Sequence, residues 1–203
     1  MKRIHHMGGL AIVIFITFHL INHLAGVFGA ESHLAVMEKL RVVYRNPFIE
    51  TILFIAVAVQ IFSGIRLSIT KWKSANLFFE KLQIWSGLYI AVFFLIHLSA
   101  VLTGRYILQL DTNFYFGVAG LNTFPHNLFF IPYYALAILS FFAHVAAIHT
   151  KKMEKVVFGI SVNTQSNLIL LVGFIITVII FYGLTNGFTG VEIPTEYGVL
   201  VGK

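Results

Sequence analysis

The sequence predicts an all-α membrane protein with five transmembrane helices, and three observations support this fold class. Hydrophobic residues make up 58% of the 203 residues and charged residues only 11%, whereas an ordinary soluble domain has about 25% charged residues. Five apolar segments reach the ~20 residues that a helix needs to cross a hydrocarbon core. The basic residues lie between these segments, which is typical of membrane topology and does not favour a nucleic-acid partner.

The predicted helices cover residues 7–28, 48–70, 84–103, 128–149 and 166–187. The first follows a basic start without a small-residue cleavage site, so we interpret it as a retained helix and not a signal peptide. Asn46-Pro47 and Ile131-Pro132 mark the starts of the second and fourth, because proline is tolerated in the first turn. The length suits one compact bundle, so we expect a single domain over residues 1–203.

Two connections have distinctive patterns. Between Glu31 and Tyr44, apolar residues recur at helical spacing, which predicts a short interfacial helix. The segment 104–127 contains several aromatic residues, which suit the boundary between membrane and water. Packing and anchoring explain both patterns without a function.

The distribution of basic residues predicts the orientation of the chain. One side holds nine: Lys2, Arg3, Arg66, Lys71, Lys73, Lys81, Lys151, Lys152 and Lys155. The other side holds five: Lys39, Arg41, Arg45, Arg105 and Lys203. Because Lys and Arg accumulate on cytoplasmic loops, we expect a cytoplasmic N-terminus and an external C-terminus.

Several kinds of chemistry are excluded within this chain. It has no cysteine, so it forms no disulfide, no thiolate-held iron-sulfur cluster and no cysteine nucleophile. It also lacks a dinucleotide-binding glycine motif and a catalytic triad pattern. Any cluster chemistry must therefore belong to a partner.

Nine histidines are unusual in so apolar a chain, and their predicted depths separate them. His33 and His126 fall in external connections, where we expect them to be solvated. His5, His6 and His149 lie at the cytoplasmic ends of helices, where they either snorkel to the interface or contact a quinone headgroup or a partner.

His19 and His97 lie inside predicted spans, where an ionisable side chain is costly and usually functional. The two helices run in the same direction, and the histidines stand roughly 18 and 20 Å above the inner boundary at 1.5 Å per residue. Two imidazoles at matching depth can bind one haem iron; the alternative is that each only hydrogen-bonds across the bundle. Bulky side chains at these levels that could flank a porphyrin are Phe15, Phe18, Phe93 and Phe94.

His23 lies one turn above His19 on the same helix face. If a haem is present, we expect His23 to hydrogen-bond an outward-pointing propionate, with Arg105 as a charged helper. There are two alternatives: His23 could replace His19 as the ligand, or it could form only a structural hydrogen bond.

His144 lies near the cytoplasmic end of the fourth helix, at another level. A second haem there would require a histidine on the second helix, which instead has Gln60, followed by Ser63 and Gly64 that leave space. Either Gln60 marks a vacant site that a histidine would restore, or other side chains have filled the space. The candidates for filling it are Phe62, Phe141 and Phe142.

Six short motifs lie along the chain: RIHHMGG at 3–9, FHLIN at 18–22, SGI at 63–65, SG at 86–87, IHL at 96–98 and FAH at 142–144. In their order and spacing, these motifs resemble the five-helix cytochrome b membrane anchors of succinate dehydrogenase and fumarate reductase of the menaquinone type. The likeness covers nearly the whole chain.

The resemblance implies a bacterial cytoplasmic-membrane protein with haem b, a quinone as substrate, and flavoprotein and iron-sulfur partner subunits on the cytoplasmic face. The outer haem pair of the family corresponds to His19 and His97. Its inner pair is represented only by His144, because Gln60 stands at the other ligand position. One haem is therefore expected, and two if the inner site is complete.

The leading hypothesis is a b-type haem subunit that carries electrons between a quinone pool and a redox partner. Whether it reacts with quinone itself or only anchors a catalytic complex stays open. One alternative is a stand-alone cytochrome that passes electrons from quinol to an external acceptor. The other is a transporter with a proton relay through His19, His97 and His144, which the scarcity of carboxylates in the spans disfavours, Glu50 being the one acidic candidate.

Overall fold

The computed structural model describes all residues from 1 to 203, and its regular elements are helices. The long helices are α1 (Lys2–Ala25), α3 (Pro47–Lys71), α4 (Phe78–Leu102), α6 (Asn127–Lys152) and α7 (Val162–Leu184). Shorter elements are α2 (Ala30–Tyr44), α5 (Phe114–Val118), a 3-10 turn at Gly26–Phe28, a π turn at Thr103–Ile107 and a 3-10 helix at Thr195–Val201. The five long helices are apolar enough to cross a membrane. The chain is therefore an all-α, integral membrane protein, as the sequence predicts.

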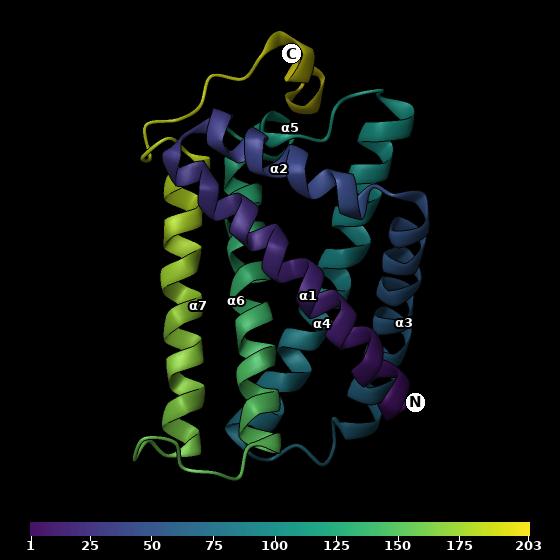
Figure 1. Ribbon diagram of the computed structural model, residues 1–203, viewed down its shortest axis with the longest axis vertical. Helices are drawn as coiled ribbons and strands as arrows, with labels where there is room; N and C mark the ends of the chain where they lie inside the picture. The colour runs from purple at the N-terminus through teal and green to yellow at the C-terminus, as the bar shows by residue number, and fades with distance from the viewer.

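The helices α3, α4, α6 and α7 stand side by side in that order, and α1 crosses diagonally over them (Figure 1). Along its length α1 contacts α3 and α7. The N-terminus lies at the same end as the α3–α4 and α6–α7 connections, here termed the N-side. At the opposite end, termed the C-side, lie α2, α5 and the C-terminus.

Several helices extend beyond the apolar segments that predict them. The first starts at Lys2 instead of Met7, and the third at Phe78 instead of Ile84. The physical reason is that polar residues outside the hydrocarbon layer continue the backbone hydrogen bonds of a helix. Pro132 is likewise the sixth residue of α6 and not in its first turn, so its use as a start marker was wrong. Asn46 does mark the start of α3, because its side chain accepts a hydrogen bond from the backbone N–H of Phe48 at 3.1 Å.

The predicted interfacial helix is confirmed as α2, which lies across the C-side of the bundle (Figure 1). Its buried residues are His33 and Met37, one turn apart on the face toward the bundle. Beneath it, the 3-10 turn Gly26–Phe28 that follows α1 touches α7 closely: a Cβ on Gly183 would lie 2.6 Å from the backbone nitrogen of Val27. Only glycine fits there, and this contact fixes the C-side end of α1.

A buried apolar cluster closes the C-side. Its members are Phe114, Val118, Leu121, Ile180, Phe181 and Leu184. The C-terminal segment covers this region through Tyr197, which is 1% exposed and whose hydroxyl donates a hydrogen bond to the carbonyl of Asp111 at 3.1 Å. The helix interiors next to the C-side are therefore shielded from water.

Candidate functional site

The C-side half of the bundle contains a cavity of about 320 Å³. Side chains of α1, α3, α4, α6 and α7 form its walls, and residues of α2 and α5 close it from the C-side. Of its 37 lining residues 25 are hydrophobic, so it suits a ligand with a large apolar surface. Its few polar residues are mainly histidines in the middle and arginines at the C-side end.

His19 of α1 and His97 of α4 both line this cavity. Their ring centroids are 6.3 Å apart and their planes are inclined at 68°. Phe15 stacks on His19 at 5.7 Å and Phe93 stacks on His97 at 5.0 Å, each nearly parallel to its histidine. The structure thus brings together the two histidines that the sequence pairs by depth, and aromatic neighbours hold each ring.

Not all of the predicted porphyrin-flanking side chains lie at the cavity. Phe15, Phe93 and Phe94 line it, but Phe18 is 50% exposed on the outer surface of α1. Successive residues of a helix point about 100° apart, so the residue before His19 turns away from the side that His19 faces. The inclusion of Phe18 was wrong.

His23 and His33 extend the histidine pair toward the C-side. The Nε2 atoms of His23 and His19 are 3.1 Å apart, and His33 Nε2 lies 3.4 Å from His23 Nδ1. His33 Nε2 is also 3.2 Å from the side-chain nitrogen of Asn22. The imidazoles of His97, His19, His23 and His33 therefore follow one another toward α2, and we term these four residues the histidine chain.

The expectation that His33 is solvated was wrong, since this residue is only 3% exposed. It shares one face of α2 with Met37 and Arg41, at successive positions four residues apart, and all three line the cavity. Burial, together with the nearby His19 and Arg41, lowers the pKa of His33 to about 4. The four-residue spacing was the sequence signal that could have placed His33 inward.

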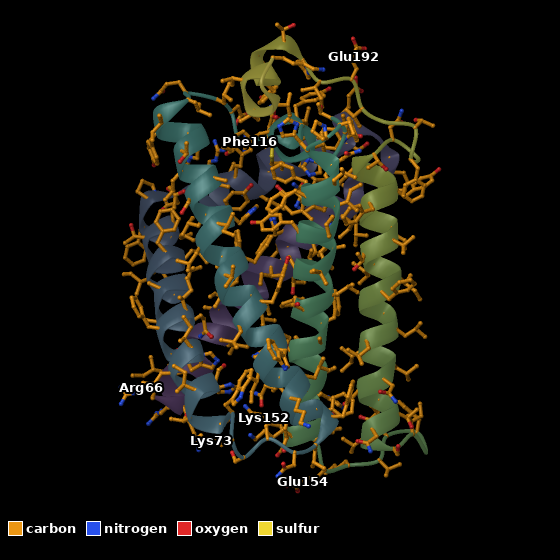
Figure 2. The ribbon with its side chains drawn as sticks, turned by 180° about the vertical axis from the view of Figure 1, so that it is seen from behind. Arg66, Lys73, Phe116, Lys152, Glu154 and Glu192 are labelled. Atoms are coloured by element: carbon orange, nitrogen blue, oxygen red, sulfur yellow. The ribbon has the colours of Figure 1, made fainter.

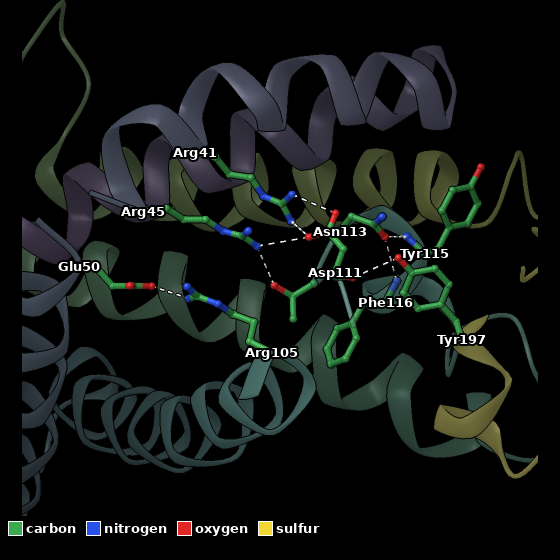
Figure 3. A network of polar contacts seen from close by, with 10 residues as sticks. Arg41, Arg45, Glu50, Arg105, Asp111, Asn113, Tyr115, Phe116 and Tyr197 are labelled. Atoms are coloured by element: carbon green, nitrogen blue, oxygen red, sulfur yellow. Dashed lines mark hydrogen bonds and ion pairs between the residues drawn. The ribbon is translucent and has the colours of Figure 1, made fainter. Parts of the chain in front are cut away.

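Three arginines form the C-side end of the cavity, which we term the arginine rim: Arg41, Arg45 and Arg105. Figure 3 shows their partners. Arg41 Nη2 lies 2.8 Å from Asp111 Oδ1, and Arg45 donates to Thr112 Oγ1 at 3.0 Å and lies 3.5 Å from Asp111.

The third rim residue, Arg105, forms an ion pair with Glu50 of α3. The sequence predicts possible roles for Arg105 and Glu50, but Arg41 and Arg45 contribute there only to the predicted orientation. Burial alone would raise the pKa of Asp111, but Arg41 and Arg45 hold it below its usual value. Arg41 and Arg45 therefore keep the carboxylate of Asp111 ionised and paired.

The two positions expected to form an inner haem site, Gln60 and His144, do not face each other. His144 faces α4, where its Nδ1 lies 3.1 Å from the carbonyl of Gln83 and 3.3 Å from Ser86 Oγ. Gln60 faces α1 instead, donating to the carbonyl of His5. Neither Gln60 nor His144 lines the cavity.

The space beside Gly64 is filled, but not by the side chains that the sequence suggested. The ring of His5 occupies it: a Cβ on Gly64 would lie 3.4 Å from His5 Cε1, and His5 Nδ1 is 2.8 Å from Ser63 Oγ. Phe62 instead points outward at 78% exposure, and Phe142 packs against Gly173 of α7. His5 is therefore a half-buried residue that packs between α1 and α3 at the N-side.

The remaining histidines lie away from the cavity. His6 is 3.2 Å from Lys152 Nζ on the exposed N-side, and His149 Nε2 is 2.9 Å from the side-chain oxygen of Gln165. His126 lies just before α6, and its Nδ1 atom is buried without a hydrogen-bond partner. The prediction that His126 is solvated was therefore wrong as well. None of these three contacts the histidine chain.

The residues of the cavity fit a haem. Two imidazoles that share one metal ion through bonds of about 2.0–2.1 Å have centroids about 6 Å apart, which matches His19 and His97. No group of three or more His, Asp or Glu side chains is arranged to hold a metal ion. The apolar walls suit the macrocycle, and the arginine rim suits its carboxylates.

Comparison of the chain with protein-family models, with curated proteins and with solved structures found no match. The candidate site is therefore defined by the geometry described above. Its central elements are the pair His19 and His97 and the arginine rim, which share one cavity.

Proposed function

We propose that this chain is a b-type haem membrane subunit that carries electrons between a quinone pool and a redox partner. The observation that carries the proposal is the placement of His19 and His97 in one apolar cavity, 6.3 Å apart. In this proposal α1, α3, α4 and α6 form a four-helix core around the cofactor. The resemblance of the histidine-containing stretches to succinate dehydrogenase and fumarate reductase anchors supports the same function.

The bound haem would supply reversible one-electron chemistry at its iron. His19 and His97 would hold the haem through their ring nitrogens, and the stacked rings of Phe15 and Phe93 would restrict the rotation of the two imidazoles. The helices exclude water from the cavity, which destabilises added charge and so tunes the reduction potential. The Nε2 atoms of His23 and His19 lie 3.1 Å apart, so binding of haem through His19 Nε2 would replace this hydrogen bond.

Electrons would reach or leave the subunit through a quinone and through soluble flavoprotein and iron-sulfur subunits. Basic side chains that suit docking lie on the N-side, where Figure 2 shows Lys73 and Lys152 at the same end as Arg66. In this proposal the N-side faces the cytoplasm, consistent with its excess of Lys and Arg.

The histidine chain supports a second candidate function, a proton relay without haem. His23 lies within hydrogen-bonding distance of both His33 and His19, and a proton pathway needs such successive contacts. However, His144 is not connected to them, so the relay through His19, His97 and His144 is not assembled. The continuous part serves only the C-side half of the bundle.

One measurement separates the two functions: the number of haems per chain, determined as the pyridine haemochrome of the purified full-length protein. The haem proposal requires a ratio near one. A ratio near zero under adequate haem supply would reject it and favour the relay. The variant His149→Ala, altered outside the cavity, serves as the matched control and should keep the wild-type ratio.

A further inference from the structure

We propose that the arginine rim is a receptor for the two propionates of haem, in which Asp111 and Glu50 hold the places that the propionates take. This inference rests on the proposed function and assigns to Arg41 and Arg45 a binding role that their position in the sequence does not indicate. It also assigns a role to the two acidic residues, as internal competitors of the ligand.

The rim and the histidine pair belong to one continuous cavity. Arg105 lies in the π turn that continues α4 within the span Phe78–Ile107, about two turns beyond His97, or roughly 12 Å along the axis at 1.5 Å per residue. A haem has its iron at the centre and both carboxylates on one edge. An iron between His19 and His97 would therefore direct that edge either toward the rim or toward purely apolar walls, and only the rim can pair the charges.

The number of carboxylates supports the assignment. Two acidic side chains occupy the rim: Asp111 pairs with Arg41 and Arg45, and Glu50 pairs with Arg105. Haem b carries two propionates, one for each of these positions. The rim has one more cation than carboxylate, so it attracts further negative charge even when both acidic residues are paired.

The donors of Arg41 are not all used. Its Nε is buried without a hydrogen-bond partner, and its side chain is only 14% exposed. A buried guanidinium nitrogen without a partner is costly, and a second carboxylate would satisfy it. Arginine also presents paired donors that match a carboxylate in two-point contacts.

Exchange of partners is possible because the competing carboxylate of Asp111 can reach water. Its side chain is 46% exposed and lies in the loop between the π turn and α5, outside any helix. Glu50 is more enclosed, at 18% exposure on α3. We therefore expect Asp111 to yield its place to a propionate more easily than Glu50 does.

The first test needs no variant. The full-length protein, prepared in a neutral detergent under haem limitation, is titrated with haemin and with haemin dimethyl ester, and binding is followed by the Soret band. The ester keeps the iron and the macrocycle but has no carboxylate charge. Since charge-assisted hydrogen bonds contribute about tenfold to a hundredfold in affinity, we expect haemin to bind at least tenfold more tightly than the ester.

The second test locates the preference. In the double variant Arg41→Gln, Arg45→Gln, the ratio of the two dissociation constants should fall toward one, with the affinity for the ester unchanged. Asp111→Asn should raise the ratio, because it removes the competing carboxylate. Lys39→Gln changes a charge on the exposed face of the same helix and should leave the ratio unaltered.

The outcomes distinguish the inference from the function on which it rests. If neither porphyrin binds to the wild-type protein, the proposed function is wrong. If both bind with equal affinity, the haem function stands and the receptor role of the rim is wrong. If the double variant does not fold, the wild-type comparison and Asp111→Asn still decide the question.

Discussion

The imidazole rings of His19 and His97 come from different helices and stand 6.3 Å apart, each stacked on a phenylalanine one turn before it. We expect His19→Ala or His97→Ala to remove the low-spin b-type spectrum, because each variant leaves only one imidazole of the pair. Retention of the spectrum in His19→Ala alone would assign the ligand role to His23, whose Nε2 is 3.1 Å from that of His19. The reduced-minus-oxidised difference spectrum of each purified variant is the measurement. Full-strength, unshifted spectra in both variants would contradict the pairing.

His144 supplies the matched control for this pair, since it is also a histidine within a span but lies outside the cavity. His144→Ala should leave the spectrum largely intact. Loss of all haem in this variant, with a correct fold, would show that the wrong pair has been assigned.

The ion pair between Glu50 and Arg105 connects α3 to the end of α4, with both side chains less than 20% exposed. Arg105→Gln leaves the Glu50 carboxylate without its partner, which should cost about 1–3 kcal/mol. The melting temperature in detergent should fall by about 2–4 °C for each kcal/mol. The double variant Glu50→Gln, Arg105→Gln removes both charges and should recover part of the loss; a double variant less stable than Arg105→Gln would argue against the pair.

The stability of α2 should depend on pH through His33. Its pKa is about 4 in the fold and about 6.5 in an unfolded chain, so between these values only the unfolded state takes up a proton. The contribution of His33 to the free energy of unfolding is therefore complete above pH 6.5 and is lost as the pH falls toward 4. Faster amide exchange in α2 at pH 5 than at pH 7.5, corrected for intrinsic rates, is the expected result.

His33→Gln should reduce this pH dependence, since glutamine does not titrate. His6→Gln, altered at the exposed N-side, is the control and should behave like the wild-type protein. Equal pH dependence in the wild type and His33→Gln would exclude His33 as the cause.

Gln60→His should not create a second haem site. The Gln60 side chain faces the backbone of α1 and lies against Gly8, while His144 faces α4. An imidazole at position 60 would meet α1 and not a cofactor. We expect the number of haems per chain to stay the same with adequate haem supply, and a rise of one would overturn this geometry.

The N-side lysines should dock the soluble partner subunits. The positions considered are Lys71, Lys73, Lys81, Lys151, Lys152 and Lys155. Exposed charges separated by more than about 8–10 Å are screened at physiological salt, so co-purification of a flavoprotein and an iron-sulfur subunit should be lost as salt rises.

Replacing Lys73, Lys81 and Lys155 by glutamate should abolish that co-purification at low salt. All three are exposed, so the fold should persist. Lys39→Glu, on the C-side, is the control and should retain the partners. Isolation of the wild-type chain alone under gentle, low-salt conditions would favour a stand-alone cytochrome.

The sequence predicts the spans well, because hydropathy over about 20 residues decides whether a helix crosses a membrane. It also predicts that His19 and His97 meet, since their depths follow from helix rise alone. Depth does not determine rotation, however. Phe18 lies at the right level and faces away, and Gln60 lies near its supposed partner level on a face turned toward α1.

The positions of His33, Arg41 and Arg45 at the cavity could not be predicted from hydropathy, because these residues lie on α2 or at its C-terminal end, outside the spans. Their positions depend on how α2 folds back over the bundle, which is fixed by long-range contacts such as that between Gly183 and the end of α1. A polar residue in a connection is usually solvated. Here the connection is itself a wall of the cavity, so the usual expectation is reversed.

The depth of His97 has an electrical consequence. It lies about two thirds of the way from the N-side along the 30-residue span Phe78–Ile107. A full membrane crossing by one elementary charge is worth about 2.3 kcal/mol per 100 mV, so an electron moving between the N-side surface and His97 would sense about 1.5 kcal/mol per 100 mV. In the proposed function, the transmembrane voltage would therefore shift the equilibrium between the soluble partner and the cavity, and a polarised membrane would favour one direction of electron flow.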